Sequence, residues 1–262
     1  MSATTLGALE SALRAKRDAG GKLLVPYITG GYGPDWTRAI EAAAAAGADA
    51  IEVGIPFSDP VMDGPTIQEA SELALRDGTT PQSVLDGIRQ LDVGVPLVVM
   101  TYYNIPFRFG FERFASSLVD AGVAAAILPD APLEEIGPWA AAADAAGVET
   151  VLLAAPTAPA DRLPGLCERS RGFVYGVGLL GVTGERAELA ASAVQMAARL
   201  KAVTDKPVLV GVGVSTPEQA AEVCAVADGV IVGSAIVRRL LDGQGPEGVA
   251  ELVGELRAAI DG

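Results

Sequence analysis

Residues 45–56 read AAGADAIEVGIP, and this stretch indicates the fold class. An alanine-rich segment typical of a helix ends at Ala46-Gly47, and glycine commonly follows a helix because it adopts the left-handed backbone conformation there. A β-branched run from Ile51 to Pro56 follows closely, which is typical of a tight connection from a helix to a strand. The Ala-Gly pair recurs at 121–122 and 146–147. The repeated junction predicts that helices and strands alternate.

This alternation continues along the whole chain. Strands are expected near residues 23–30, 50–56, 96–103, 124–130, 149–156, 172–178, 207–213 and 229–234. Helices are expected near 35–47, 66–76, 81–91, 110–121, 133–146, 159–169, 189–203, 216–226 and 235–260. The first residues lack the basic start and apolar core of a targeting segment, and they predict an extra amphipathic helix with Leu6, Leu9 and Leu13 on one face.

Two architectures fit such an alternation. The competing one is a doubly wound parallel sheet, and residues 176–181 match the G-x-G-x-x-G pattern of a dinucleotide-binding turn. That site requires an acidic residue about 20 positions further on, but residue 201 is a lysine. We therefore expect an α/β fold, a single (β/α)8 TIM barrel with an extra N-terminal helix, in which residues 1–262 form one domain.

The composition restricts the possible partners and location. The formal net charge of −14 argues against nucleic acids and anionic membranes as partners, because both would be repelled. The longest apolar runs, such as 97–100, are far shorter than the roughly 20 residues of a membrane span, so we expect a cytoplasmic protein. Cys167 and Cys224 have no neighbouring Cys or His, which predicts two buried free thiols.

The absence of histidine restricts the chemistry. It excludes serine–histidine triads, histidine-ligated metals and histidine acid/base catalysis. A Schiff-base mechanism needs a lysine at the carboxyl end of a strand. The four lysines, two in expected helices and two before expected strands, are Lys16, Lys201, Lys22 and Lys206. What remains is acid/base chemistry by carboxylates on a phosphorylated substrate, with Tyr102 or Tyr175 as a possible helper.

Glu52 is the first candidate carboxylate. In a strand at 50–56, Ile51 and Val53 share the face that packs under the helices, whereas Glu52 points into the barrel. A buried, unpaired carboxylate costs several kcal/mol, which favours a functional role. The alternatives are an internal hydrogen bond that satisfies Glu52, or a strand boundary in another place.

Asp63 is the second candidate. It lies in the turn-rich segment 57–66, at the carboxyl end of the strand, where barrel enzymes hold their active sites. Two carboxylates in one mouth can divide the acid and base roles if burial raises the pKa of one of them. The alternative is that Asp63-Gly64-Pro65 is ordinary turn chemistry.

Glycines cluster where the last three strands end, at 181–184, 211–213 and 233–234. Backbone N–H groups and the start of a helix near Gly233-Ser234 can hold a phosphate without any lysine. The alternative is that these glycines only form turns.

The segment from Glu52 to Gln68, EVGIPFSDPVMDGPTIQ, closely resembles the signature of the tryptophan synthase alpha chain family. Further motifs follow in the family's order over essentially the whole chain: Tyr102-Tyr103-Asn104, Leu128-Pro129-Asp130, Gly181-Val182-Thr183-Gly184, Gly211 to Ser215 and Asp228 to Ala235. The resemblance implies cleavage of indole-3-glycerol phosphate to indole and glyceraldehyde 3-phosphate.

The resemblance also implies residue roles. Glu52 would be the acid/base at indole C3 and the glycerol hydroxyl, and Asp63 would stabilise charge at the indole N–H. The phosphate would bind Gly184, Gly213, Gly233 and Ser234. The indole pocket would contain Leu24, Ile67, Tyr102, Tyr175 and Thr183. Tyr102 and Tyr175 could equally fill the core.

Members of the family pass indole to a beta chain that carries pyridoxal phosphate, so the resemblance implies an α2β2 assembly and no cofactor in this chain. The partner contacts would include Pro56, Asp59, Asn104 and Asp130. The chain departs from the family at Gly178-Leu179, where Ser and often Arg are usual, which predicts weaker coupling of the following loop to the partner.

Three other functions stay open. One is a stand-alone indole-3-glycerol-phosphate lyase that releases free indole. Another is a non-catalytic barrel that activates a partner, against which the pair Glu52 and Asp63 argues. The third is a different phosphate-binding barrel isomerase, which would explain the glycines but not the segment from Glu52 to Gln68.

Overall fold

The computed structural model describes residues 6–178, 186–211 and 213–262. Eight parallel strands form a closed barrel in sequence order, because β1 pairs with both β2 and β8. The strands are β1 Leu23–Thr29, β2 Ile51–Gly54, β3 Leu97–Met100, β4 Val123–Ile127, β5 Glu149–Ala154, β6 Val174–Val177, β7 Val208–Gly211 and β8 Gly229–Val232. The TIM barrel is therefore confirmed, and the doubly wound sheet is excluded.

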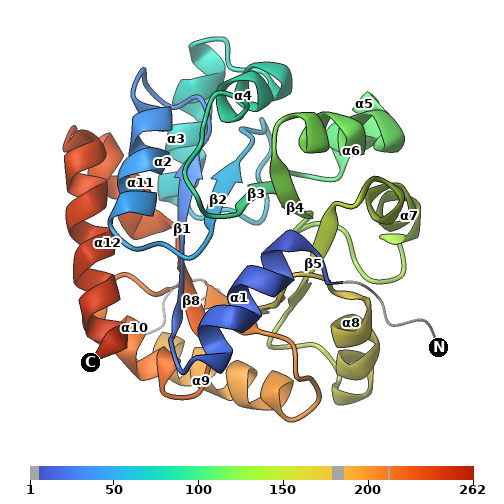
Figure 1. Cartoon of the computed structure of the whole chain (residues 1–262), viewed down its shortest axis with the longest axis vertical. Coiled ribbons are helices and arrows are strands. Elements are labelled where there is room, and N and C mark those ends of the chain that lie inside the picture. The colour runs from blue at the N-terminus through green and yellow to red at the C-terminus, as the bar shows by residue number, and fades with distance from the viewer. Residues whose placement is uncertain (1–5, 179–185, 212) are drawn as a thin grey trace.

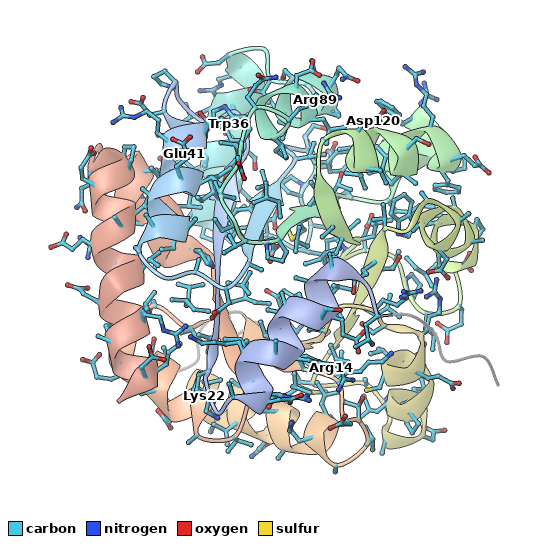
Figure 2. All side chains as sticks on the ribbon, in the orientation of Figure 1. Arg14, Lys22, Trp36, Glu41, Arg89 and Asp120 are labelled. Carbon is cyan, nitrogen blue, oxygen red and sulfur yellow. The ribbon has the colours of Figure 1, made fainter. Side chains whose placement is uncertain are left out.

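Most helices surround this barrel on its outer side, and the first helix lies across one end of it (Figure 1). The helices are α1 Ala8–Asp18, α2 Trp36–Ala45, α3 Pro65–Arg76, α4 Pro81–Ile88, α5 Asn104–Phe109, α6 Phe111–Asp120, α7 Gly137–Ala146, the 3-10 helix η1 Ala160–Arg162, α8 Leu163–Arg169, α9 Arg186–Lys201, α10 Pro217–Cys224, α11 Ser234–Leu241 and α12 Gly245–Asp261. Charged side chains such as those of Arg89 and Asp120 lie at the outer surface (Figure 2). None of the described helices has the length and apolar character of a membrane span.

Several element limits differ from the sequence expectation. The strands end earlier than expected; β2, for example, stops at Gly54 rather than at residue 56. The stretch 235–260 is two helices, because Gly243 and Gly245 both adopt positive φ and interrupt it. Helix α5 was not expected at all. Helix α7 begins at Gly137 rather than at 133.

Apolar side chains alternate between two layers. Ile51, Val53 and Ile55 pack into the outer core under the helices, whereas Ala50 belongs to the inner core of the barrel. Glu52 lies between Ile51 and Val53 on β2, so it shares the inner face with Ala50. The expected direction of Glu52 is therefore confirmed.

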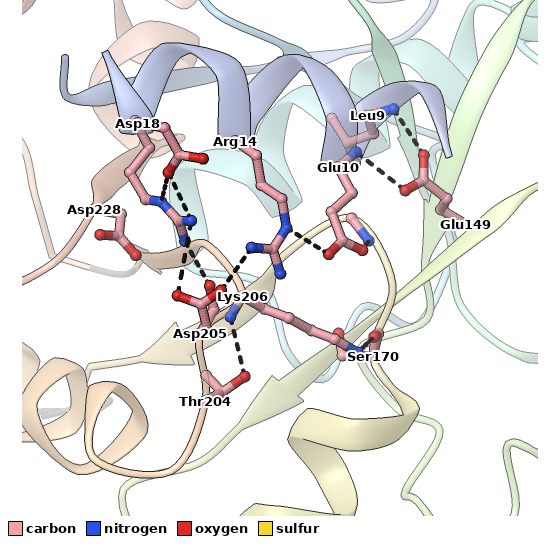
Figure 3. A network of polar contacts seen from close by, with 12 residues as sticks. Leu9, Glu10, Arg14, Asp18, Glu149, Ser170, Thr204, Asp205, Lys206 and Asp228 are labelled. Atoms are coloured by element: carbon pink, nitrogen blue, oxygen red, sulfur yellow. Dashed lines mark hydrogen bonds and ion pairs between the residues drawn. The ribbon is translucent and has the colours of Figure 1, made fainter. Parts of the chain in front are cut away.

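Helix α1 closes the amino end of the barrel (Figure 1). Leu9 and Leu13 are fully buried within the inner core, but Leu6 precedes the helix and is 48% exposed, so its expected place on the apolar face is wrong. The Glu149 carboxylate on β5 accepts hydrogen bonds from the N–H groups of Leu9 (2.7 Å) and Glu10 (3.1 Å). This carboxylate replaces a side-chain cap at the start of α1 and fixes the helix to the barrel (Figure 3).

The lysines and cysteines lie where the sequence indicated. Lys16 and Lys201 are in helices α1 and α9, and Lys22 directly precedes β1, where its ammonium group donates to the carbonyl of Ala227 (3.1 Å) (Figure 2). Cys167 and Cys224 are buried, unpaired thiols, as expected.

Candidate active site

A cavity of about 360 Å³ opens at the carboxyl ends of the strands. Its wall consists of inward-facing strand residues and of the loops that follow β2, β7 and β8. The lining residues are Tyr27, Glu52, Met62, Asp63, Gly64, Ile67, Met100, Ile127, Pro129, Leu153, Tyr175, Val177, Gly213, Val214, Ser215, Gln219, Ile231, Gly233 and Ser234. The mostly apolar wall with a few convergent polar groups is typical of a small-molecule site.

Glu52 is the more deeply buried of the two carboxyl groups that line this cavity. Its side chain is almost inaccessible, with 2% of the residue exposed, and its Oε2 atom has no hydrogen-bond partner. Burial, and secondly the nearby Asp63 carboxylate, raise the pKa of Glu52 to about 8. The side chain is therefore protonated near neutral pH and can donate a proton into the cavity.

Asp63 lines the same cavity from the loop between β2 and α3. Burial raises its pKa to about 6, although a hydrogen bond from the Tyr102 hydroxyl favours the charged form. Two hydrogen bonds to backbone carbonyls fix the loop. The Asp63 N–H donates to the carbonyl of Pro60 (3.1 Å), and the Gln68 side-chain amide donates to the carbonyl of Asp63 (2.8 Å). Near pH 7 this carboxyl is mainly ionised while Glu52 is mainly neutral, which divides the acid and base roles.

Tyr102 contacts the loop that carries Asp63. Its hydroxyl accepts a hydrogen bond from the N–H of Met62 (2.9 Å) and also binds the Asp63 carboxylate. Its ring stacks on Phe57, with 4.9 Å between ring centroids. Tyr102 does not line the cavity itself, so the structure gives it a place next to Asp63 rather than in the expected pocket wall.

The expected phosphate residues that the structure describes lie at one side of the cavity mouth. Gly213, Gly233 and Ser234 all line it, and Gly213 has a φ of +90° that favours glycine. Helix α11 begins at Ser234, so its first N–H groups have no partner within the helix. The helix dipole and these donors favour an anion at this point. Gly184 lies outside the described residues.

The expected indole residues divide into two groups. Ile67 and Tyr175 line the cavity, whereas Leu24 is fully buried in the outer core under the helices. The expectation for Leu24 is therefore wrong, because alternation along β1 turns Leu23, Val25 and Tyr27 inward instead. Thr183 lies outside the described residues.

The expected partner contacts also divide. Asp59, Asn104 and Asp130 are exposed, and Asp130 accepts a hydrogen bond from the N–H of Tyr103 (2.8 Å), so it lies beside the start of α5. Pro56 is buried within the chain. It lies two residues after the end of β2 and offers little of its own surface, so its contact with a partner stays a prediction.

Several cavity residues were not found from the sequence. Tyr27, Met100, Ile127, Leu153, Val177 and Ile231 all line the wall. Each lies near the carboxyl end of a strand, and the period-two alternation was the signal that could have identified them. Within the described ranges, no three Cys, Asp or Glu side chains are grouped as metal ligands.

Comparison with known proteins gives a consistent result. The family model described as "Tryptophan synthase alpha chain" matches residues 13–258. The chain is 45% identical to a tryptophan synthase alpha chain from Streptomyces coelicolor over 263 aligned positions, covering 97% of each protein. It superposes on a solved tryptophan synthase from Mycobacterium tuberculosis with a TM-score of 0.90, at 39% identity and with 98% and 99% coverage of the two chains. A tryptophan synthase subunit alpha from Legionella pneumophila gives a TM-score of 0.88 at 33% identity, with 98% and 99% coverage.

Proposed function

Because this chain belongs to the tryptophan synthase alpha chain family, we propose that Glu52 and Asp63 perform the cleavage of indole-3-glycerol phosphate that this family catalyses. In this proposal the chain is a carbon–carbon lyase, and the reaction is a retro-aldol cleavage. The observation that carries it is the pair itself: a buried carboxyl with an unpartnered Oε2 faces the same cavity as a second, half-buried carboxyl.

The first step requires an acid inside the cavity. Protonated Glu52 donates its proton to C3 of the indole ring, which becomes an indolenine with positive charge at its nitrogen. The Asp63 carboxylate accepts the N–H hydrogen bond and stabilises that charge. The raised pKa of Glu52 supports this step, because the carboxyl still holds its proton near pH 7.

The second step uses the carboxylate that the first one leaves. Glu52 takes the proton from the glycerol hydroxyl next to the ring, and the resulting oxygen electrons form the aldehyde carbonyl. The bond between that carbon and indole C3 breaks, and its electron pair returns to the ring to give indole. The ring is thus its own electron sink, and the reaction needs no group beyond this chain's carboxylates.

The rest of the cavity binds the substrate in this proposal. The phosphate binds the N–H groups at the start of α11 together with Gly213, Gly233 and Ser234, and Gly184 is assigned to the same site. The indole ring lies between apolar wall residues, with Ile67 and Tyr175 among them and Thr183 assigned by family resemblance. The acidic chain needs no cationic side chain for this, because backbone donors supply the attraction.

We also propose the stoichiometry of the assembly and the residues that contact the partner. The family and its solved structures imply a beta chain as partner. We propose an α2β2 assembly in which pyridoxal phosphate is bound only by the beta chain. Asp59, Asn104 and Asp130 would face that chain, and residues 1–262 would act as one cytoplasmic domain.

Indole release from indole-3-glycerol phosphate by the purified chain, alone and with a beta chain, tests this function. Stimulation by the beta chain supports a synthase subunit. Fast unaided turnover without stimulation would instead indicate a stand-alone lyase. No indole under either condition would contradict the proposed reaction and favour a non-catalytic barrel.

A further inference from the structure

Tyr27 lies beside Glu52 on the inner face of the barrel. The register of β1 and β2 pairs Tyr27 directly with Glu52, and both residues line the cavity. Tyr27 is 4% exposed and Glu52 is 2% exposed, so both side chains are almost completely buried. No role for Tyr27 follows from the two-carboxylate mechanism described above.

The ring of Tyr27 extends across β2 and covers Gly54. A Cβ atom on Gly54 would overlap the hydroxyl oxygen and Cζ of Tyr27 and would lie 2.7 Å from its Cε2. Any side chain at position 54 would therefore displace this ring. Gly54 is two residues after Glu52 on the same inner face, so the ring reaches from β1 over the strand that carries Glu52.

The other side of Tyr27 contacts the elements that carry the remaining site residues. A Cβ atom on Gly233, which precedes α11, would lie 3.6 Å from the Cβ of Tyr27. Tyr27 also forms a small apolar cluster with Ala70 of α3, Val237 of α11 and Ile67. One ring thus packs between Glu52, the helix after the Asp63 loop and the helix at the phosphate side.

We propose that Tyr27 is a positioning residue: its ring, seated over Gly54, closes the β1 side of Glu52 to water and holds the carboxyl toward the cavity. The role of Tyr27 in catalysis rests on the proposed function, whereas the shielding of Glu52 by Tyr27 is independent of that function. The hydroxyl oxygen, Cζ and Cε2 of Tyr27 together fill the space above Gly54. The shielding is assigned to the ring as a whole, which a phenylalanine would keep.

The groups around Glu52 make this role measurable. Asp63 faces it from the loop after β2, Tyr175 from β6 and Tyr27 from β1, and Tyr102 lies behind Asp63. Burial and Asp63 raise the pKa of Glu52, and burial is the larger cause. Removing the Tyr27 ring admits water on one side, so the proton affinity of Glu52 should fall while Asp63 stays in place.

The test is a titration of Glu52 in the full-length protein. NMR of protein labelled with 13C at glutamate carboxyl groups, with Glu52→Gln to assign the signal, gives the midpoint for wild type, Tyr27→Leu and Tyr27→Phe. We expect Tyr27→Leu to lower the midpoint by about one pH unit, a common size for an environmental effect. Tyr27→Phe is the matched control and should stay near wild type. An equal effect of both variants, or none of either, would overturn the proposal.

Gly54→Ala supplies an independent test of the same geometry. It should lower the midpoint as Tyr27→Leu does, because the new methyl group displaces the ring. In the double variant Tyr27→Leu/Gly54→Ala the second change should add little, since the clash is gone. Fully additive effects would contradict the geometry, and if Gly54→Ala does not fold, the Leu and Phe comparison decides alone.

The pH profile of indole release separates this inference from the proposed function. The limb that reports Glu52 should move with the NMR midpoint in Tyr27→Leu. If the NMR midpoints move as expected but no protein, wild type included, releases indole, the proposed function fails and the shielding role stands. If indole is released and the pH profile of its release is the same in Tyr27→Leu as in the wild type, the positioning role is wrong.

Discussion

Replacing Glu52 with Gln should make the protein more stable at high pH. The Glu52 pKa is raised to about 8 in the folded state from an ordinary value of 4.5. A carboxyl whose folded pKa is raised contributes its stability below the unfolded pKa and loses it as the pH rises through the folded pKa. The Gln side chain does not titrate, so the variant keeps its free energy of unfolding where the wild type loses part of it as the pH rises.

The size of the effect follows from the two pKa values. The difference between 4.5 and about 8 corresponds, at about 1.4 kcal/mol per pH unit, to an upper limit of roughly 5 kcal/mol. The side chain is almost completely buried, and its Oε2 atom has no partner that would stabilise the charge. We therefore expect the wild type to lose roughly 2–5 kcal/mol relative to Glu52→Gln between pH 5 and pH 9.

Urea unfolding at pH 5, 7 and 9 measures this difference. Each free energy of unfolding is compared between the two proteins at one pH, so that the titration of Asp63 and of surface groups largely cancels. The exposed Glu222→Gln is the matched control and should show no such trend. A difference between wild type and Glu52→Gln that stays constant from pH 5 to pH 9 would refute the assignment of Glu52 as a proton-holding group.

Three further changes test other contacts. Tyr102→Phe removes the hydroxyl that binds the Asp63 carboxylate and the N–H of Met62. The steady-state rate of indole release should fall about tenfold, as for a lost hydrogen bond of about 1.4 kcal/mol. An unchanged rate would contradict the role of Tyr102 in holding Asp63. Glu149→Ala removes the hydrogen-bond acceptor at the start of α1. The free energy of unfolding, measured by urea denaturation, should fall by about 1–2 kcal/mol. An unchanged free energy of unfolding would mean that α1 docks without this cap. Gly178→Ser restores the residue usual in the family and should increase stimulation by the beta chain; no change in the stimulated rate would count against altered coupling at this position.

The inner and outer faces of the strands could be predicted from the sequence wherever alternation was applied. Glu52 was placed inside the barrel because Ile51 and Val53 had to pack under the helices, and this direction is confirmed. The same rule would have placed Leu24 outside and Tyr27 inside. The expectation for Leu24 came from family resemblance rather than from β1 itself, and it was wrong.

Contacts between distant segments could not be predicted in the same way. The hydrogen bond from the N–H of Met62 to the hydroxyl of Tyr102 joins residues from different loops. No pattern within either segment of sequence indicates it. The break between α11 and α12 was different in kind, since Gly243 and Gly245 were visible signals of a turn. The expectation of one helix over 235–260 did not take these two glycines into account.

The most direct test of the central claim is the rate of indole release from indole-3-glycerol phosphate by Glu52→Gln and Asp63→Asn beside the wild type. Both variants keep the size of the side chain but remove its proton chemistry or charge. We predict that each rate falls by about 10²- to 10⁴-fold, the usual contribution of acid/base catalysis, in proteins that fold as the wild type does. A folded Glu52→Gln variant that retained the wild-type rate would contradict the mechanism.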